Sequence, residues 1–212
     1  MKIGILGSGT VARTLAAGFD HHGHDVMLGT RDPAKLESWL GEHPDVSAGS
    51  VADAATFGDV IVLAVKGIAA EAVVRAAGED ALSGKVVIDT TNPIADAPPE
   101  NGVLRFFTGL DESLMERLQA VAPLARFVKS FSCVGAPLMV NPSFEGGPAT
   151  MFICGNDASA RATVHELLDQ FGWEIADMGG AEAARAIEPL CILWCIPGFL
   201  RNEWSHALKL VR

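Results

Sequence analysis

Residues 1–35, MKIGILGSGTVARTLAAGFDHHGHDVMLGTRDPAK, contain the stretch that decides the fold. A short apolar run at residues 3–6 ends in glycine, which is typical of a buried strand. Residues 7–12, GSGTVA, follow as a G-x-G-x-x-A version of the dinucleotide fingerprint. In this motif the first glycine permits a sharp turn and the second lets a pyrophosphate approach the backbone. The small third residue lets the new helix pack closely on the strand.

The residues after the fingerprint complete the strand–helix–strand unit that it requires. An amphipathic helix is predicted from about Thr10 to His22, with Gly23 ending it, and a second strand from Asp25 to Gly29. Such a helix points free N–H groups and the positive end of its dipole at a phosphate. An ordinary glycine turn is the alternative, but the complete unit favours a dinucleotide site. The predicted phosphate-binding residues are Gly7, Ser8, Gly9, Thr10 and Val11.

The end of the second strand indicates which dinucleotide binds. An NAD site usually places Asp or Glu there to bind the ribose 2′-hydroxyl. This chain has Gly29-Thr30-Arg31 instead, and a hydroxyl and a guanidinium suit a 2′-phosphate. Lys35, one helical turn further on, is predicted to reach the same phosphate. The alternative is that Arg31 and Lys35 are solvated charges, but the pattern favours NADP over NAD.

The rest of the chain alternates between apolar strands and helices. The predicted strands lie at 3–6, 25–29, near 46, 59–66, 85–89, 126–131, 149–154 and 173–178. This alternation predicts an α/β fold of the Rossmann type, doubly wound, with one mainly parallel sheet of about eight strands. Ligands bind such sheets where strand order reverses, at the strands' carboxyl ends. Ala64 and Val65, together with Asn92 and Pro93, are therefore predicted to border the nicotinamide, although Asn92-Pro93 is equally compatible with a plain turn.

The chain is predicted to have two parts. Residues 1–180 form the NADP-binding domain with the cleft for a second substrate, and 181–212 form a helical segment kinked at Pro189 or at Pro197-Gly198. This segment is apolar nearly all round, so it must be buried. It could cover its own cleft or pack in a second subunit, and a homodimer is the simplest expectation.

Composition restricts the partners of the protein. The 212 residues carry a net charge of −10 from 26 acidic and 16 basic residues, which argues against nucleic acid and anionic membranes as partners. The most apolar stretch, residues 189–200, is shorter than a membrane span of about 18 residues. The N-terminus leads directly into the fingerprint, without a signal peptide. We therefore expect a cytoplasmic protein without membrane partners.

The cysteines and histidines show no metal-ligand spacing, so no metal site is predicted. Cys191 and Cys195 are four residues apart and could form a redox pair. Free cysteines are so often buried as small apolar side chains that this second interpretation is favoured for the pair.

Three blocks together resemble one family, the NADP-linked oxidoreductases of the deazaflavin coenzyme F420. The blocks are residues 1–35, then Val128-Lys129-Ser130-Phe131 with the run 148–157, PATMFICGND, and finally Ala184 to Leu190, ARAIEPL. The resemblance covers most of the chain. It implies that Thr30 and Arg31 hold the NADP 2′-phosphate, which agrees with the prediction made above from their side chains. One departure is that relatives tend to have Lys-Ala-Phe-Asn where this chain has Lys129-Ser130-Phe131-Ser132.

The resemblance also implies the reaction. A hydride moves between nicotinamide C4 and the deazaflavin C5, with F420 as the second substrate. Such a transfer needs orientation and exclusion of water rather than acid–base chemistry, so no individual catalytic residue is predicted. The residues expected to border the hydride acceptor are Ser132, Cys133, Val134, Gly135 and Ala136.

Other functions stay open at this point. The acceptor could be a flavin, a quinone, an imine or a carbonyl compound. A reductase of imines or carbonyls needs a proton donor, and Lys66, Lys129 and Ser132 are the candidates at strand ends. A non-catalytic NADP-binding sensor or regulatory subunit is a further alternative, because the apolar C-terminal segment could bind another protein.

Overall fold

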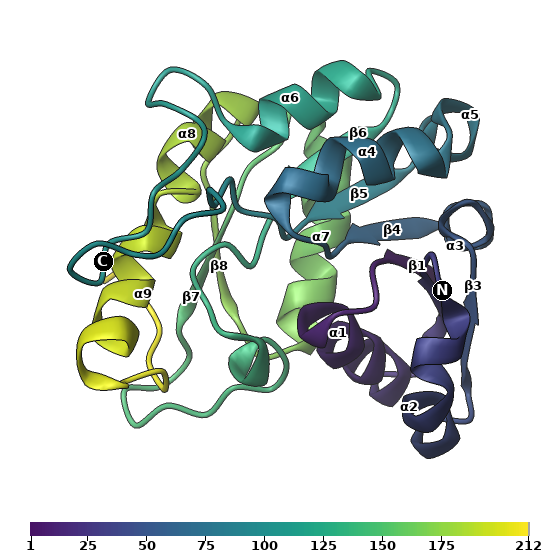
Figure 1. Cartoon of the computed structure of the whole chain (residues 1–212), viewed down its shortest axis with the longest axis horizontal. Helices are drawn as coiled ribbons and strands as arrows, with labels where there is room; N and C mark the ends of the chain where they lie inside the picture. Colours follow the sequence, from purple (N-terminus) through teal and green to yellow (C-terminus); the bar gives the residue numbers. More distant parts are fainter. Residues whose placement is uncertain (212) are drawn as a thin grey trace.

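The computed structural model describes residues 1–211 (Figure 1). Arg212, the last residue of the predicted C-terminal segment, lies outside the described residues. Eight strands form, each within a residue or a few of its predicted position. The strands are β1 (Lys2–Leu6), β2 (Asp25–Gly29), β3 (Val46–Gly49), β4 (Val60–Leu63), β5 (Val86–Asp89), β6 (Arg126–Lys129), β7 (Thr150–Ile153) and β8 (Glu174–Asp177).

Helices connect these strands. The α-helices are α1 (Thr10–His21), α2 (Glu37–Glu42), α3 (Val51–Phe57), α4 (Gly67–Ala77), α5 (Glu79–Leu82), α6 (Leu114–Val121), α7 (Ala158–Gln170), α8 (Ala184–Ile187) and α9 (Leu190–Arg201). Short 3₁₀ turns are η1 (Pro33–Leu36), η2 (Ala136–Leu138) and η3 (Ala181–Ala183).

The main sheet confirms the predicted Rossmann topology. Its six strands are all parallel, in the order β3-β2-β1-β4-β5-β6. The strand order reverses between β1 and β4, so the carboxyl ends of these two strands form the expected ligand crevice. The chain therefore has the α/β Rossmann-like fold.

The eight strands do not share one sheet, which corrects the predicted size of the sheet. Strands β7 and β8 pair with each other as a separate parallel pair. Phe131 has a left-handed φ of +59°, which turns the chain out of the sheet soon after β6. Cys154, directly after β7, then forms one isolated antiparallel bridge with Lys129 of β6. The small sheet lies beside α9 in Figure 1, away from the main sheet's β3 edge.

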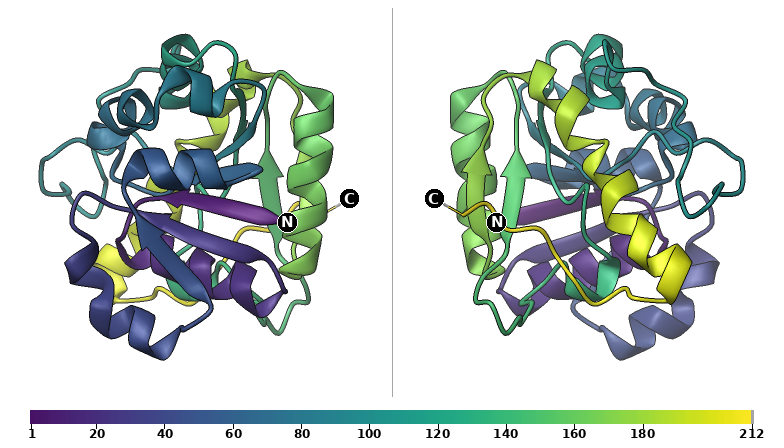
Figure 2. Two further views of the ribbon diagram at one scale, coloured as in Figure 1. Left: turned by 90° about the vertical axis from the view of Figure 1, so that its right-hand side faces the viewer. Right: turned by 90° about the vertical axis from the view of Figure 1, so that its left-hand side faces the viewer.

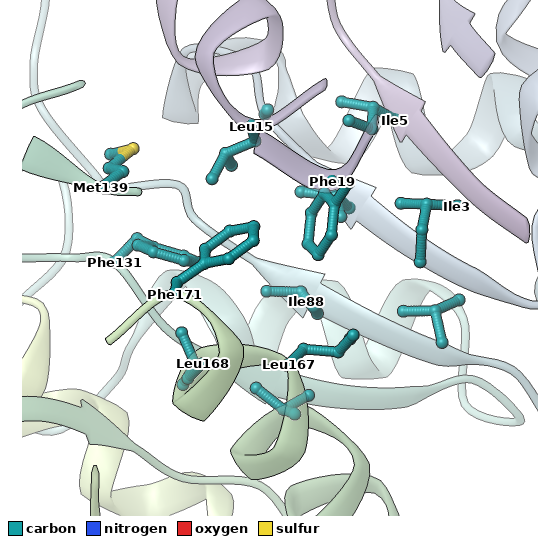
Figure 3. Packing of buried hydrophobic residues seen from close by; sticks show 14 of the residues in the cluster. Ile3, Ile5, Leu15, Phe19, Ile88, Phe131, Met139, Leu167, Leu168 and Phe171 are labelled. Atoms are coloured by element: carbon teal, nitrogen blue, oxygen red, sulfur yellow. The ribbon is translucent and has the colours of Figure 1, made fainter. Parts of the chain in front are cut away.

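Alternate residues of the main strands pack on opposite faces. Ile3 and Ile5 of β1 belong to the cluster that also contains α1 and α7 residues, whereas Leu6 belongs to the cluster under α3, α4 and α6. Figure 3 shows the first cluster, with Phe19 of α1 directed toward Phe171 at the end of α7. This two-sided burial is what a parallel sheet with helices on both faces requires.

The C-terminal segment departs from its prediction. It kinks at Glu188-Pro189, between α8 and α9, as expected, but the helix ends at Arg201 rather than continuing to the end of the chain. Asn202 adopts the left-handed conformation that commonly ends a helix. The following residues return to β7, where the amide of Thr150 donates to the carbonyl of Leu208 at 2.9 Å (Figure 2).

Taken together, η3, α8 and α9 form one helical segment, Ala181–Arg201, that is long and apolar enough to cross a membrane by length and composition. A core helix of a globular protein meets the same criterion, and here Cys191, Trp194 and Cys195 are buried against the domain. Leu193 and Leu200 on the same helix are about half exposed. The homodimer, the absence of membrane partners and the cytoplasmic location stay predictions.

The start of α6 and the C-terminal segment are joined by an ion pair that makes stability depend on pH. Glu116 accepts from the Arg185 guanidinium at 2.5 Å and completes a capping box with Ser113. The hydrogen bond from Arg185 is the largest cause that lowers the pKa of Glu116 from 4.5 to about 2. A carboxylate with a depressed pKa stabilises the fold above its unfolded pKa, and the contribution is lost as pH falls toward the folded value.

We therefore expect Glu116→Gln to lower stability at pH 7 by about 1 kcal/mol, the size of a partly exposed ion pair with a cap. Thermal unfolding followed by circular dichroism tests this. The difference in Tm between the two proteins is expected to shrink between about pH 4.5 and pH 2. A difference that stays constant over that range would contradict it.

Candidate functional site

The first glycine of the fingerprint is required by the fold itself. Gly7 has φ +143°, and a Cβ there would lie 2.2 Å from the carbonyl oxygen of Ala64. Its amide donates to the carbonyl of Gly29 at 2.9 Å. The turn out of β1 is thus packed tightly between the exits of β2 and β4. A side chain at this position is incompatible with that packing.

The second glycine is not required by the fold. Gly9 has an ordinary φ of −75°, and no atom of the described residues lies within 4 Å of the position of a Cβ. The helix that begins here has no side-chain cap and no acidic residue in its first turn. By contrast, Ser50, Ser113 and Asp157 cap α3, α6 and α7. The site thus offers free N–H groups and open space at the place where a pyrophosphate binds.

The end of β2 is joined to the glycine loop by hydrogen bonds. The Thr30 hydroxyl donates to the Ser8 hydroxyl at 3.1 Å and accepts from the amide of Asp32 at 3.3 Å. Arg31 is exposed and forms no ion pair within residues 1–211. Lys35 lies elsewhere: its ammonium is 3.5 Å from Asp32, and its side chain is 79% exposed. Arg31 is therefore the available cation at the loop.

A groove of about 650 Å³ runs along these elements. It contains nine of the twelve predicted cofactor residues: Gly7, Ser8, Gly9, Thr10, Val11, Thr30, Arg31, Ala64 and Val65. Lys35, Asn92 and Pro93 do not line it. The groove also contains nine residues outside that set. Gly29, Lys66 and Thr90 lie at the ends of strands that the sequence pointed to, whereas the sequence reasoning missed Val51, Ile68, Ala69, Ala72, Val73 and Ala76.

Five of the missed residues come from α4, and the sequence contained a signal for them. Helix α4 has two apolar stripes. One contains Ala70, Val74 and Ala77 and is buried in the core. The other begins at Ile68, which is 66% exposed, and forms an apolar wall of the groove. A helix needs only one apolar stripe for packing, so the second one indicates a ligand.

Asn92 lies beside the predicted acceptor loop. Its amide nitrogen donates to the carbonyl of Ser132 at 2.9 Å, joining the exits of β5 and β6. The Asn92 carbonyl oxygen and the hydroxyls of Ser130 and Ser132 are buried without a hydrogen-bond partner among the described residues. Pro93 accepts from the amide of Phe107. The structure thus brings Asn92 together with the second-substrate residues rather than with the groove.

Helix α9 covers the predicted acceptor loop. Ser132, Cys133 and Val134 are buried, while Gly135 and Ala136 are partly exposed. A Cβ at Gly135 would lie 2.8 Å from the ring of Trp194, so the indole packs directly on the loop. Helix α9 thus packs on this loop of its own chain, and its predicted roles, cover of the cleft or dimerisation, stay predictions.

A buried group of three charges lies below these loops, and the sequence reasoning did not connect its members. The Lys129 ammonium is 2.6 Å from a carboxylate oxygen of Asp89 and 2.8 Å from one of Glu188, and all three side chains are at most 1% exposed. Burial lowers the pKa of Lys129, but the two carboxylates outweigh it and hold the pKa above its usual value. Lys129 is therefore unsuited to be the proton donor that a carbonyl reductase needs. The available sequence signal was that two apolar strands end in a charged residue, Asp89 in β5 and Lys129 in β6.

The four cysteines are free and buried. Burial raises the pKa of the Cys133 thiol to about 11 and that of Cys154 to about 12. Thiols of this kind react slowly, because the thiolate is the nucleophile. Within residues 1–211 no group of His, Cys, Asp or Glu side chains could hold a metal ion.

A Rossmann fold with an open phosphate-binding turn, an apolar groove and a free arginine at the end of β2 defines an NADP-dependent oxidoreductase. Residues 2–93 match the family described as NADP oxidoreductase, coenzyme F420-dependent. A solved structure from an Arthrobacter species, assigned as an F420-dependent NADP reductase, is 35% identical over the full length of both chains with a TM-score of 0.94. The chain belongs to this F420-dependent NADP oxidoreductase family, and it binds NADP.

Two curated proteins resemble this chain over very different shares of their own length. The F420-dependent NADP reductase of Methanothermobacter marburgensis is 29% identical, covering 99% of each chain. Rat metalloreductase STEAP3 is 30% identical over 94% of this chain, but the chain spans only 39% of that protein. An imine reductase from Streptomyces aurantiacus, 15% identical with a TM-score of 0.67, shares the fold.

Proposed function

We propose that this protein transfers a hydride between NADP(H) and a deazaflavin of the coenzyme F420 type. The observation that carries the proposal is the full-length match to F420-dependent NADP reductases, 99% or more of both chains in two cases. In relatives named for other activities, the match covers only part of the relative's own chain, 39% of rat STEAP3 and 63% of the imine reductase.

The chain's own residues have distinct tasks in this proposal. The turn at Gly7 to Val11 binds the pyrophosphate through backbone N–H groups, and Arg31 with Thr30 binds the 2′-phosphate. Ala64 and Val65 border the nicotinamide, and Asn92 reaches toward the acceptor loop. The bound nicotinamide supplies the hydride chemistry.

The acceptor side of the proposed site is the loop 132–136 below α9. Trp194 of α9 excludes water from this loop by packing on Gly135. Ser132 and Asn92 contribute the unpartnered polar atoms here, and such atoms suit the polar edge of a heterocyclic ring. Orientation and water exclusion are sufficient for hydride transfer, because no proton has to be moved by a side chain at the reacting carbon.

Reduction of an imine or carbonyl compound is less well supported. Such a reaction needs a donor near the acceptor, yet Lys129 is buried in its ion pairs and the Ser132 hydroxyl is buried. Lys66 is exposed at the start of α4, where it lines the cofactor groove. A flavin acceptor remains the second candidate, because it accepts a hydride without a dedicated proton donor.

Stopped-flow absorbance at 340 nm tests the proposal by offering coenzyme F420 and flavin mononucleotide in parallel to the NADPH-loaded protein. Fast oxidation with F420 and slow or no oxidation with the flavin is the expected result. Oxidation by the flavin alone would replace the proposal with the second candidate. NADPH that binds and reacts with neither would overturn both.

A further inference from the structure

Two of the blocks that carry the family resemblance meet in space. Lys129 belongs to the block Val128–Phe131 and Glu188 to the block Ala184–Leu190, and the two side chains are 2.8 Å apart. Asp89 is the cross-strand neighbour of Lys129 in the β5–β6 register. These three residues, here called the buried triad, connect the main sheet to the turn between α8 and α9.

All three N–H donors of the Lys129 ammonium have a partner. Its three contacts are Asp89 at 2.6 Å, Glu188 at 2.8 Å and the carbonyl of Thr91 at 2.8 Å. A buried ion pair is weak evidence for stability, because desolvation offsets most of the attraction. The contribution of the buried triad is therefore to fix the positions of the elements that its members bind.

Asp89 holds the start of the loop after β5, where Thr90 lines the cofactor groove. Its carboxylate accepts from both the amide and the hydroxyl of Thr91, at 2.9 and 2.6 Å. Thr91 precedes Asn92, which in turn binds the carbonyl of Ser132. The loop that follows β5 is thus anchored at Thr91 to a carboxylate that is itself completely buried.

Glu188 holds the acceptor side. Its two carboxylate oxygens accept from the amides of Leu114 and Met115 at the start of α6, at 2.9 and 3.0 Å. It also lies directly before Pro189, the N-cap residue of α9. Trp194, just over one turn into α9, packs on Gly135 of the acceptor loop. Displacing Glu188 therefore displaces the helix that covers this loop.

We propose that Lys129 is a positioning residue that sets the separation between the two halves of the hydride-transfer site, with Asp89 positioning the nicotinamide loop and Glu188 positioning the covering helix. This inference rests on the proposed function. The two carboxylates share one ammonium but hold different elements, so their roles can be separated. A displacement of about 1 Å in such a site is enough to slow transfer by about 100-fold.

The test compares Asp89→Asn with Glu188→Gln. Each variant removes one negative charge from the same ammonium and leaves one carboxylate to pair with it, so the electrostatic change is matched. Asp89→Asn is expected to raise the Kd for NADPH about tenfold and to leave the KM for F420 nearly unchanged. Glu188→Gln is expected to raise the KM for F420 about tenfold and to leave the Kd for NADPH nearly unchanged. Glu112→Gln, which removes a carboxylate from an exposed pair with Arg117, is the control and should change neither.

Quenching of Trp194 fluorescence by acrylamide provides a readout that does not depend on turnover. Trp194→Phe identifies its share of the signal. Glu188→Gln is expected to make Trp194 more accessible, and Asp89→Asn is not. If Glu188→Gln does not fold, Glu188→Asp, which keeps the charge but shortens the reach, takes its place.

The inference would be overturned if the Kd for NADPH and the KM for F420 changed equally in both variants. It would also be overturned if the Tm fell while both constants stayed unchanged. Failure of the proposed function is recognised separately. If the unaltered protein does not reduce F420, the Kd for NADPH and the accessibility of Trp194 still decide whether the two carboxylates act on different sides of the site.

Discussion

Gly9→Ala is expected to weaken NADPH binding by at least about tenfold while leaving the Tm nearly unchanged. The Cβ of the variant meets no protein atom within 4 Å, and the φ of −75° is acceptable to alanine. Alanine is a poorer N-cap than glycine, but it also reduces the entropy of the unfolded chain, and the two effects offset each other. The added methyl group occupies the space through which a pyrophosphate approaches the backbone.

Gly7→Ala is the matched variant with the opposite expectation. Its Cβ would lie 2.2 Å from the carbonyl oxygen of Ala64 at a φ of +143°, so the cost falls on folding, at about 2–4 kcal/mol. Isothermal titration with NADPH and thermal unfolding of both variants separate the two roles. Unchanged NADPH affinity in a well-folded Gly9→Ala protein would contradict the assignment of this turn to the pyrophosphate.

Arg31→Ala is expected to raise the Kd for NADPH by about 10- to 100-fold and to leave the Kd for NADH nearly unchanged. A hydrogen bond to a charged group contributes about 1.5–3 kcal/mol, which corresponds to that range. Arg31 has no carboxylate partner within residues 1–211, so its removal leaves no protein charge uncompensated. Fluorescence titration with both cofactors measures the effect.

Lys35→Ala is the control for Arg31. Lys35 lies beside Asp32, outside the groove, so its removal is expected to change NADPH affinity by less than about threefold, as for a surface ion pair. Arg31→Lys should recover only part of the affinity, because an ammonium lacks the two-pronged geometry of a guanidinium. Equal losses for NADPH and NADH in Arg31→Ala would remove the 2′-phosphate role.

Much of the cofactor half of the site could be predicted from sequence because its elements are local. The strand, the turn at Gly7–Ala12, helix α1 and strand β2 form one continuous unit, and each residue's role follows from its position in that unit. Seven of the nine predicted cofactor residues that line the groove lie in or directly after this unit, and the other two, Ala64 and Val65, follow β4. Lys35 lies 3.5 Å from Asp32 and does not line the groove, so its predicted contact with the 2′-phosphate stays a prediction.

The size of the sheet could not be predicted in the same way. Eight strand patterns were correct, but which strands pair depends on contacts between distant residues. The left-handed Phe131 and the single bridge from Lys129 to Cys154 separate β7 and β8 from the main sheet. Neither feature has a local sequence pattern, since phenylalanine rarely adopts a left-handed φ.

The sequence was therefore sufficient for the Rossmann unit, the NADP-binding turn and the preference for a 2′-phosphate, because short-range periodicity and glycine geometry encode them. Tertiary structure alone decided the group of buried charges below the predicted acceptor loop. Asp89, Lys129 and Glu188 come from three separate parts of the chain, and only folding buries their charges together. Burial makes such charges dependent on one another, and no spacing in the sequence shows which charges will share a buried space.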